Sequence, residues 1–237
     1  MTQLFPLKVT GAESRRRGKL LVGPVDLELW PTGTTIVIGP NGSGKTTLLS
    51  LLHGTSRLNA GQVTWACSTE DARRHQSFVF QRPVMLRRSV VDNIAYPLGL
   101  RGHDTKTARA QATEWAIRVG LGDMLTRPAT VLSGGEQQKL ALARALISQP
   151  KLVFLDEPCA ALDGRAMREI ETILTEVKAA GTRIILSTHD LGQARRLADE
   201  VLFLKGGLIH EQGLAPAFFD QPQTSEAQAF LKGDIVE

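Results

Sequence analysis

The sequence is poor in cysteine, with only Cys67 and Cys159 among its 237 residues. Two cysteines do not build a disulfide framework, which favours a reducing cytosol. No uninterrupted apolar run approaches the roughly 18 residues that a membrane-spanning helix needs. The first residues, MTQLFPLKV, lack a basic stretch followed by a long apolar region. We therefore expect neither a transmembrane helix nor a secretory signal.

The chain also lacks a dominant basic cluster, although its formal net charge is +4 and its pI is near 9.3. Lysines and arginines are scattered along it, apart from short runs at residues 15–17 and 87–88. Nucleic acids and anionic membranes attract concentrated positive charge. The scattered distribution favours an ordinary solvated surface, and we expect no nucleic-acid partner.

The most specific motif is GPNGSGKT at residues 39–46, which matches the phosphate-binding pattern G-x-x-x-x-G-K-[ST] at every position. Backbone N–H groups of such a loop point at a polyphosphate. Lys45 supplies charge for the outer phosphates, and the Thr46 hydroxyl can join the shell of a bridging Mg²⁺. The β-branched run 34–38 predicts a buried strand before the loop, and residues 45–52 predict a helix after it. The expected nucleotide-binding residues are Gly39, Pro40, Asn41, Gly42, Ser43, Gly44, Lys45, Thr46 and Thr47.

Two adjacent acids, Asp156 and Glu157, follow the apolar run 152–155. That run predicts a buried strand, and ligands bind beyond the carboxyl ends of strands in open α/β sheets. In a protein with a phosphate loop, an acid at this place holds Mg²⁺, a role that we assign to Asp156. Glu157 then polarises a water as a general base, which contributes about 10²–10⁴-fold to hydrolysis. Without the phosphate loop, the same acidic pair would equally fit the start of a turn.

A second glycine-rich helix start is LSGGEQQK, residues 132–139. Ser133 and Glu136 have the spacing of a capping box, so one interpretation is simply a stable helix start. Gly134 and Gly135 are costly there unless another group must approach the exposed N–H groups closely. Because a helix N-terminus attracts anions, the segment predicts a second phosphate contact that has no phosphate-loop lysine.

The order of the remaining elements favours an α/β fold with a mainly parallel sheet. Strand patterns return at residues 62–65, 77–80, 152–155, 183–186 and 201–204. Strand signals are scarce between about residues 82 and 150, where residues 105–119 and 136–148 have helical patterns. We therefore expect one domain, residues 1–237, with an inserted helical subdomain at about 82–150. A core-facing helical stripe is predicted for Met167, Ile170, Ile173, Leu174 and Val177.

The motifs GPNGSGKTT, LSGGEQQK, LVFLDEP, AALD and STHD occur in this order and span nearly the whole chain. In these motifs the sequence resembles the ATP-binding subunits of ABC transporters. The resemblance implies a P-loop NTPase fold of the ABC type, with a mainly parallel sheet, an inserted helical subdomain and an N-terminal antiparallel β region. It also implies ATP and Mg²⁺ as ligands and ATP hydrolysis as the activity.

In that family each ATP lies between the phosphate loop of one subunit and the LSGGQ-type signature of a second, in a head-to-tail dimer. The resemblance thus implies a homodimer in which the signature contacts the other copy's nucleotide, and it places Asp163 at the interface. It makes Gln81 a sensor of Mg²⁺ and γ-phosphate, and His189 a γ-phosphate contact that helps hold Glu157. The implied signature residues are Ser133, Gly134, Gly135 and Glu136; the implied catalytic residues are Lys45, Gln81, Glu157 and His189; the implied metal ligands are Thr46, Gln81 and Asp156.

Two positions depart from the family pattern. Members often stack an aromatic side chain on adenine, but the matching region, residues 14–17, contains none. An arginine plane could replace part of a stacking interaction of about 0.5–1.5 kcal/mol, so we expect weaker base selectivity, and the choice between ATP and GTP stays open. Lys139 stands where the signature helix often has arginine, and lysine lacks the planar fork for a bidentate contact.

Two other classes of protein also use a phosphate loop. Soluble ABC-type ATPases act on nucleic acid or the ribosome, but the 87 residues between Lys45 and Ser133 leave no room for a long coiled coil or a zinc insertion. Enzymes that phosphorylate small molecules need neither the signature helix nor a histidine after the last core strand. The motif set favours a transporter subunit, with the soluble ATPase as the alternative.

A single cassette without a membrane segment implies a separate transmembrane permease subunit, as in bacterial importers. We also expect a solute-binding protein outside the membrane, and a peripheral position for this chain on the cytoplasmic face of the inner or plasma membrane. Residues 79–98 correspond to the family's permease-docking region, although their apolar side chains equally fit a core. The segment FQRPVMLRRSVVDNIAYPL looks similar to the ATP-binding subunits of importers of oxyanions such as tungstate, molybdate or phosphate.

Overall fold

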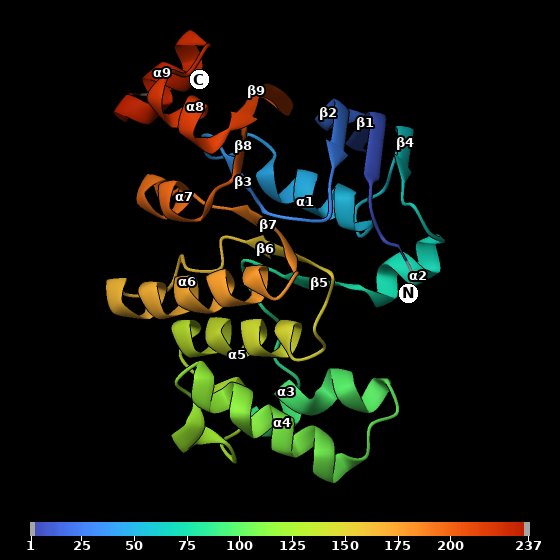
Figure 1. The fold of residues 1–237 in the computed structure, drawn as a ribbon, viewed down its shortest axis with the longest axis vertical. Helices are drawn as coiled ribbons and strands as arrows, with labels where there is room; N and C mark the ends of the chain where they lie inside the picture. The colour runs from blue at the N-terminus through green and yellow to red at the C-terminus, as the bar shows by residue number, and fades with distance from the viewer. Residues whose placement is uncertain (1–2, 235–237) are drawn as a thin grey trace.

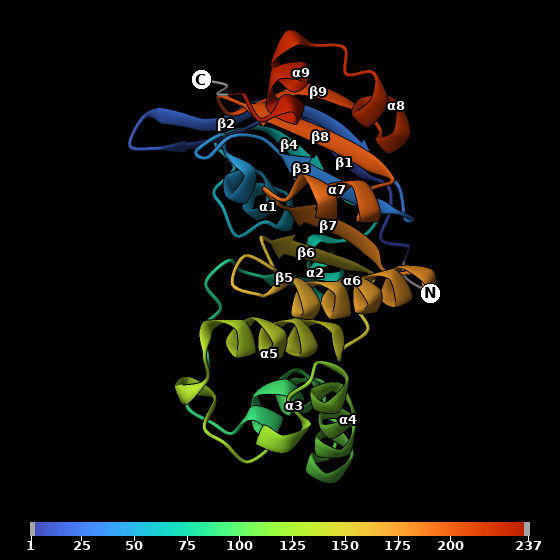
Figure 2. The same cartoon turned by 90° about the vertical axis from the view of Figure 1, so that its left-hand side faces the viewer.

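The computed structural model of the chain describes residues 3–234 and contains a large and a small β-sheet (Figures 1 and 2). The strand order of the large sheet is β5 (Gln76–Val79), β6 (Leu152–Asp156), β7 (Arg183–Ser187), β3 (Thr34–Ile38), β8 (Glu200–Lys205) and β9 (Leu208–Leu214). Adjacent strands from β5 to β8 are parallel, and β9 runs antiparallel to β8. The small antiparallel sheet has the order β2 (Lys19–Leu29), β1 (Leu7–Arg16) and β4 (Ala60–Thr64). This α/β architecture confirms the predicted fold class.

Helices surround the large sheet and also form a separate layer (Figure 1). Between β5 and β6 the chain is helical, with α3 (Val90–Leu100), α4 (Thr105–Arg118), the short 3₁₀ turns η1 (Gly122–Met124) and η2 (Ala129–Val131), and α5 (Gly134–Leu146). The other helices are α1 (Lys45–His53), α2 (Thr69–Arg74), α6 (Gly164–Ala179), α7 (Leu191–Leu197), α8 (Ala215–Asp220) and α9 (Ser225–Lys232). None of the helices within residues 3–234 combines the length and the apolar character needed to cross a bilayer.

The central strands separate two hydrophobic cores. Every residue of β3, β6 and β7 is buried, and successive side chains point to opposite faces of the sheet. Val37, Phe154 and Ile185 pack on one face, against α1 and the small sheet. Ile36, Val153 and Leu186 pack on the other face, against the helices. Burial on both faces explains why these strands read as continuous apolar runs in the sequence.

Most predicted elements lie within a few residues of the observed ones. The strand predicted at residues 62–65 corresponds to β4, which pairs antiparallel with β1 in the small sheet. Its residues are exposed except for the half-buried Val63, so it can form a sheet edge. On α6 the predicted stripe is confirmed: Ile170, Ile173 and Leu174 are buried, and Met167 and Val177 pack partly against the same core.

The pattern analysis did not predict α3. This helix contains Pro97, which removes an intrahelical hydrogen bond, and Gly99, which disfavours helix. It forms because Ser89 caps its start and because Val90, Ile94 and Leu98 are buried in the core. Tertiary packing therefore overrides the local signals that disfavour a helix here.

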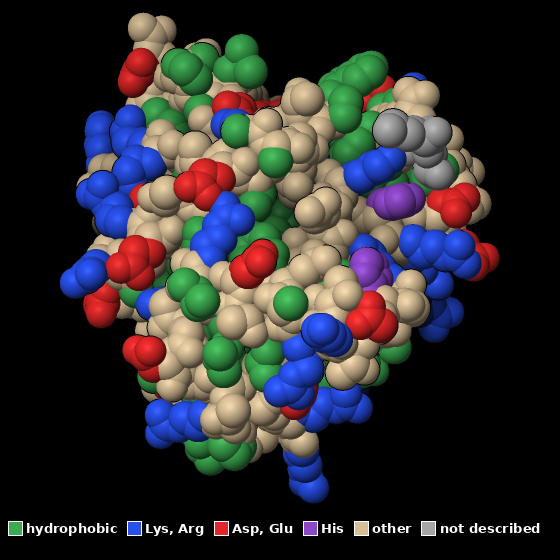
Figure 3. All heavy atoms as spheres, turned by 60° about the horizontal axis from the view of Figure 1, so that its bottom comes forward, with side chains coloured by type: hydrophobic (Ala, Val, Ile, Leu, Met, Phe, Trp, Pro, Cys, Tyr) green, Lys and Arg blue, Asp and Glu red, His purple; other side chains and the backbone are tan. Residues whose placement is uncertain are grey.

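Charge is dispersed on the face that the helical layer presents. Lysines and arginines form several separate groups there, with acidic and apolar side chains among them (Figure 3). This distribution agrees with the interpretation of the basic residues as solvated surface.

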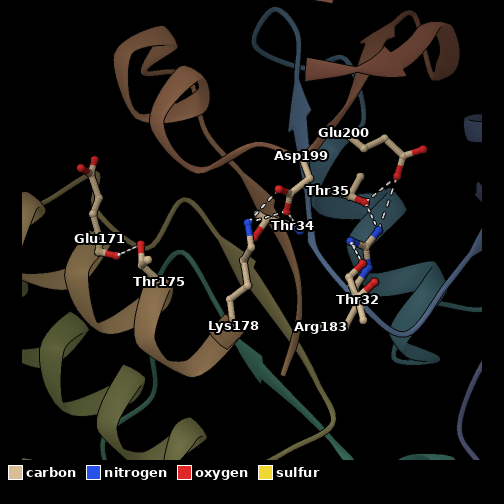
Figure 4. A network of polar contacts seen from close by, with 9 residues as sticks. All are labelled: Thr32, Thr34, Thr35, Glu171, Thr175, Lys178, Arg183, Asp199 and Glu200. Carbon is tan, nitrogen blue, oxygen red and sulfur yellow. Dashed lines mark hydrogen bonds and ion pairs between the residues drawn. The ribbon is translucent and has the colours of Figure 1, made fainter. Parts of the chain in front are cut away.

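Arg183 is the first residue of β7, and it lies in the middle of a polar network at the amino ends of the central strands (Figure 4). Its side chain is buried, and it donates to the Thr32 carbonyl at 2.7 Å and to the Thr35 hydroxyl. The carboxylate of Glu200 lies 3.4 Å from the same guanidinium. Beside this cluster, Lys178 pairs with Asp199, whose Oδ2 also accepts from the Thr34 N–H at 2.6 Å.

We expect Arg183→Met to lower the free energy of unfolding by about 2 kcal/mol, because buried acceptors lose their donors and Glu200 loses its counter-charge. Lys178→Met, which removes a partly exposed cation nearby, should change it by less than about 1 kcal/mol. Urea-induced unfolding of both variants without nucleotide measures the difference. Equal losses in the two variants would contradict the structural role of Arg183.

Candidate functional site

The phosphate loop connects β3 to α1 and turns its lysine inward. Lys45 is buried, and its ammonium donates to the carbonyls of Gly39 at 2.9 Å and Pro40 at 3.2 Å. Burial lowers the pKa of Lys45, while the nearby carboxylates Glu157 and Asp156 act in the opposite direction. The ammonium group is bonded to neutral carbonyls, so it can exchange these hydrogen bonds for contacts with the charged outer phosphates when a nucleotide binds.

The backbone and side chains of the loop also fit a triphosphate. Gly44, the N-cap of α1, has a φ of 104°, and a Cβ there would lie 2.6 Å from Val22. Only glycine permits this backbone, which brings the loop against β2. The buried Ser43 hydroxyl has no hydrogen-bond partner among the described residues. An unpaired buried hydroxyl is costly unless a ligand satisfies it, and a phosphate oxygen would do so.

Asp156 lies at the carboxyl end of β6, beside α1. The Thr46 hydroxyl donates to its Oδ2 at 2.8 Å, and the Ser187 hydroxyl donates to its Oδ1 at 2.6 Å. The parallel pairing of β6 and β7 sets Asp156 opposite Ser187. The structure therefore brings together two of the three predicted metal ligands, Thr46 and Asp156. A hydroxyl and a carboxylate are oxygen ligands that suit Mg²⁺.

Glu157 connects the remaining predicted catalytic residues. Its Oε2 accepts from the Gln81 amide at 3.0 Å and lies 3.3 Å from Nδ1 of His189. Its φ is +47°, an uncommon conformation for a non-glycine residue, and its N–H points at the carbonyl and hydroxyl of Ser187, 3.1 Å from each. The carboxylate faces a hollow of about 260 Å³ that residues of the phosphate loop and Gln81 also line.

The signature segment lines a separate hollow of about 560 Å³, which Asp163 shares. Ser133 and Glu136 form the predicted capping box at the start of α5, with Glu136 accepting from the Ser133 N–H at 2.7 Å. The N–H and hydroxyl of Ser133 lower the pKa of the Glu136 carboxyl. Asp163 caps α6 by accepting from the Ala166 N–H at 2.8 Å. Within one chain the signature is thus not part of the phosphate-loop hollow.

The two signature glycines differ in their surroundings. A Cβ on Gly135 would lie 3.1 Å from the Ala161 carbonyl oxygen and 3.2 Å from Leu162, so a side chain there would be tightly packed. A Cβ on Gly134 would have only an ordinary contact, 3.9 Å from Ala161. The chain's own packing therefore favours glycine at position 135 and leaves position 134 open, and the contact of both residues with a ligand stays a prediction.

At both positions that depart from the family pattern, a basic side chain pairs with a glutamate of the same chain. Arg15, in the region without an aromatic, is bonded through Nε to Glu13 at 2.9 Å. Lys139 lies 3.6 Å from Glu169 on α6, a point-charge pair without a bidentate contact. Stacking by an arginine in this region remains a prediction.

Ser187 opens the STHD motif, but the motif analysis gave it no role in the site. It ends β7, bonds the side chain of Asp156 and accepts from the backbone of Glu157. The available signal was a hydroxyl at the last position of the otherwise apolar run 184–187. Its role depends on the strand order, because β6 and β7 are far apart in sequence and become neighbours only in the folded sheet.

A phosphate loop between a parallel strand and a helix, with acids at the end of another strand of the same sheet, defines a P-loop NTPase. The family profile described as ABC transporter matches residues 22–160. The chain belongs to the ABC transporter family, as an ATP-binding subunit with ATP hydrolase activity.

Its relatives include ATP-binding proteins of several transport systems. The tungstate uptake system protein of Peptoclostridium acidaminophilum is 40% identical over 187 residues, covering 78% of this chain and 86% of the relative. The L-cystine transport system protein of Escherichia coli K12 is 33% identical, covering 98% and 99%. A phosphate import protein of Natronomonas pharaonis is 34% identical, covering 97% and 87%.

Solved structures confirm the fold. A dimeric ATP-binding cassette with bound ADP and phosphate aligns with a TM-score of 0.78 at 24% identity, covering 88% of this chain and 98% of that one. A Clostridium perfringens protein, described as part of an ABC transporter complex, aligns with a TM-score of 0.78 at 25% identity, covering 92% of both.

We expect Ser187→Ala to lower the kcat of ATP hydrolysis by about tenfold, because one hydroxyl orients Asp156 and supports the Glu157 backbone. Thr182→Ala removes a buried hydroxyl just before β7, at the end of the strand away from the acids, where it bonds the Pro150 carbonyl. This control should keep near-normal kcat. Steady-state phosphate release measures both, and an unchanged kcat in Ser187→Ala would refute the assignment.

Proposed function

We propose that ATP binding closes a head-to-tail homodimer of this chain, that hydrolysis reopens it, and that this cycle drives solute import through a permease. One observation carries the proposal: a single carboxylate, that of Glu157, contacts both Gln81 and His189 beside the phosphate loop. Three segments that are distant in sequence therefore converge beside the phosphate loop.

In the proposed reaction, Lys45 and the loop N–H groups bind the outer phosphates of ATP, and Glu157 accepts a proton from the attacking water. His189 contacts the γ-phosphate and orients Glu157, and Gln81 senses the nucleotide. Thr46, Asp156 and Gln81 would hold Mg²⁺, which neutralises charge on the phosphates. In the structure Gln81 bonds Glu157, so its metal contact requires a shift of its amide group.

The separation of the two hollows supports the dimer. The signature segment and Asp163 share one hollow, and the phosphate loop and Glu157 line the other. A second copy could bring its signature, Ser133 to Glu136, against the nucleotide of the first. The similarly folded cassette with ADP and phosphate is dimeric, which supports a dimer of this chain.

The permease would dock on the helical subdomain, for which we propose the limits of about 82–150. Phe80, Val84 and Leu100 are exposed apolar residues in or next to the segment 79–98, and Val84 is 74% exposed. Tyr96 and Arg88 line a neighbouring hollow between α3 and α4. Docking there would hold the chain at the cytoplasmic face of the membrane.

An oxyanion is the proposed substrate, delivered by a solute-binding protein. The sequence around Gln81 resembles oxyanion importers, and the relatives include tungstate and phosphate systems. The cystine and arginine systems among the relatives define the competing substrate class. The alternative of a soluble ATPase acting on nucleic acid or the ribosome has no comparable support, since the relatives described above belong to transport systems.

We expect Glu157→Gln to bind ATP normally and to hydrolyse it about 10²–10⁴-fold more slowly, because the amide cannot accept the proton from water. The variant should accumulate as a dimer with ATP and remain a monomer with ADP. Size-exclusion chromatography with light scattering measures the assembly, and phosphate release measures turnover. Near-normal turnover would remove Glu157 from the proposed role.

The trapped dimer also tests the signature. Adding Gly134→Asp to Glu157→Gln should abolish the ATP-dependent dimer, because the new carboxylate would repel the other copy's phosphates. Gly134 is the better position than Gly135, where a side chain would collide with Ala161 and Leu162. A dimer that tolerates Gly134→Asp would contradict the proposed placement of the signature.

Uptake measurements test the substrate class. We expect cells that express this chain together with its permease and solute-binding protein to accumulate tungstate, molybdate or phosphate above background. Glu157→Gln should abolish the uptake, because transport requires hydrolysis. Uptake of cystine or arginine without any oxyanion would contradict the oxyanion assignment.

A further inference from the structure

His189 needs an explanation for its fixed position. Its side chain is 60% exposed, so burial does not hold it, and its contact with Glu157 spans 3.3 Å. It lies just before α7, a helix of seven residues. A helix this short gains little stability from its own hydrogen bonds and depends on tertiary contacts. The contacts that hold α7 therefore also set the position of His189.

The strongest of these contacts is an ion pair between α7 and α6. Arg196 Nε and Nη2 each lie 2.7 Å from a different oxygen of Glu171. The side chain of Glu171 is only 8% exposed, and that of Arg196 is 35% exposed. A two-pronged, partly desolvated pair of this kind fixes orientation as well as distance. We call it the α6–α7 clamp.

The clamp lies close to the start of α7. A Cβ on Gly192 would sit 3.0 Å from Nη1 of Arg196 and 3.1 Å from Asp190, so the guanidinium lies against the first turn. Asp190 caps that turn by accepting from the Gln193 N–H at 2.7 Å, and its own N–H bonds the Thr188 hydroxyl. His189 therefore lies in the chain between Thr188 and the capped first turn of α7, and the Arg196 guanidinium contacts that turn.

A second contact connects α7 to the loop after Glu157. Gln193 is buried, and its side chain lies beside the thiol of Cys159, two residues beyond Glu157, although its amide nitrogen has no hydrogen-bond partner among the described residues. Burial raises the pKa of this thiol to about 11, so it stays neutral. The helix is thus held on one side by the loop that carries Glu157 and on the other by α6.

The other partner in the clamp, α6, begins at Asp163 in the signature hollow. In both ribbon views α7 lies above α6 (Figures 1 and 2), and the clamp joins the two helices. One helix therefore starts at the proposed dimer interface and the other directly after His189. If the clamp holds the two helices rigidly together, a movement of α6 at Asp163 also moves the start of α7 beside His189.

We propose that Glu171 and Arg196 are positioning residues that hold His189 against Glu157 and couple its position to the dimer interface through α6. This inference rests on the proposed function, in which His189 assists hydrolysis and Asp163 meets a second copy. Neither clamp residue lines the phosphate-loop hollow. Their effect acts only through the geometry of His189.

The test is the substitution Arg196→Lys, which keeps the charge but removes the fork. We expect kcat to fall about tenfold while KM for ATP stays within about twofold, because misplacement of a catalytic group by about 1 Å can cost up to 10²-fold in rate. Glu171→Gln should have the same effect from the other side of the clamp. Arg195→Lys is the matched control, since Arg195 lies on the same helix but contacts Phe219 and should keep normal kcat.

A double-mutant cycle separates positioning from a general loss of structure. In a His189→Ala background, Arg196→Lys should cause no further loss of kcat, measured with radiolabelled ATP, because its effect passes through His189. An equal tenfold loss in both backgrounds, or no loss in Arg196→Lys alone, would overturn the clamp proposal. Normal turnover in His189→Ala would instead overturn the role of His189 in the proposed function, and the clamp proposal with it.

Discussion

The hydrogen bond from Ser187 to Asp156 joins the last residues of β6 and β7, and the candidate site depends on that alignment. It orients the acid beside Thr46, and the same serine receives the N–H of Glu157. The carboxylate of Glu157 in turn contacts Gln81 and His189. Because side chains alternate across a strand, a slip of one residue between β6 and β7 would turn these groups to opposite faces. The register of two buried strands is therefore the physical condition for the whole arrangement.

The fold also separates the two glycine-rich segments of the chain. The phosphate loop follows β3, whereas the signature begins α5 in the helical layer and lines a hollow with Asp163. The two hollows belong to different parts of the chain, so a second copy is a natural way to combine them. Within each copy, α6 and α7 connect the signature hollow to His189. This gives the proposed dimer a route by which closure could affect hydrolysis.

The elements that could be predicted are those whose signal is local. The phosphate loop and the strands β3, β6 and β7 follow from glycine spacing and short apolar runs, since these strands are buried on both faces. The failures arose where distant parts of the chain decide. Residues 60–64 look like any short strand but pair with β1, and α3 forms around Pro97 because its apolar face is buried. The tight packing of Gly135 against Ala161 was likewise not visible in the sequence.

By itself the sequence determined the chemistry: a phosphate-binding loop, two acids after a buried strand, a capped glycine-rich helix start and a histidine before a short helix. Each of these is encoded within a few consecutive residues, because turn geometry, capping and burial of a strand are local properties. Only the tertiary structure decided which of them meet. Ser187 and the α6–α7 clamp join residues 31 and 25 positions apart. No local pattern encodes such contacts, because they exist only after the sheet has paired and the helices have packed against it.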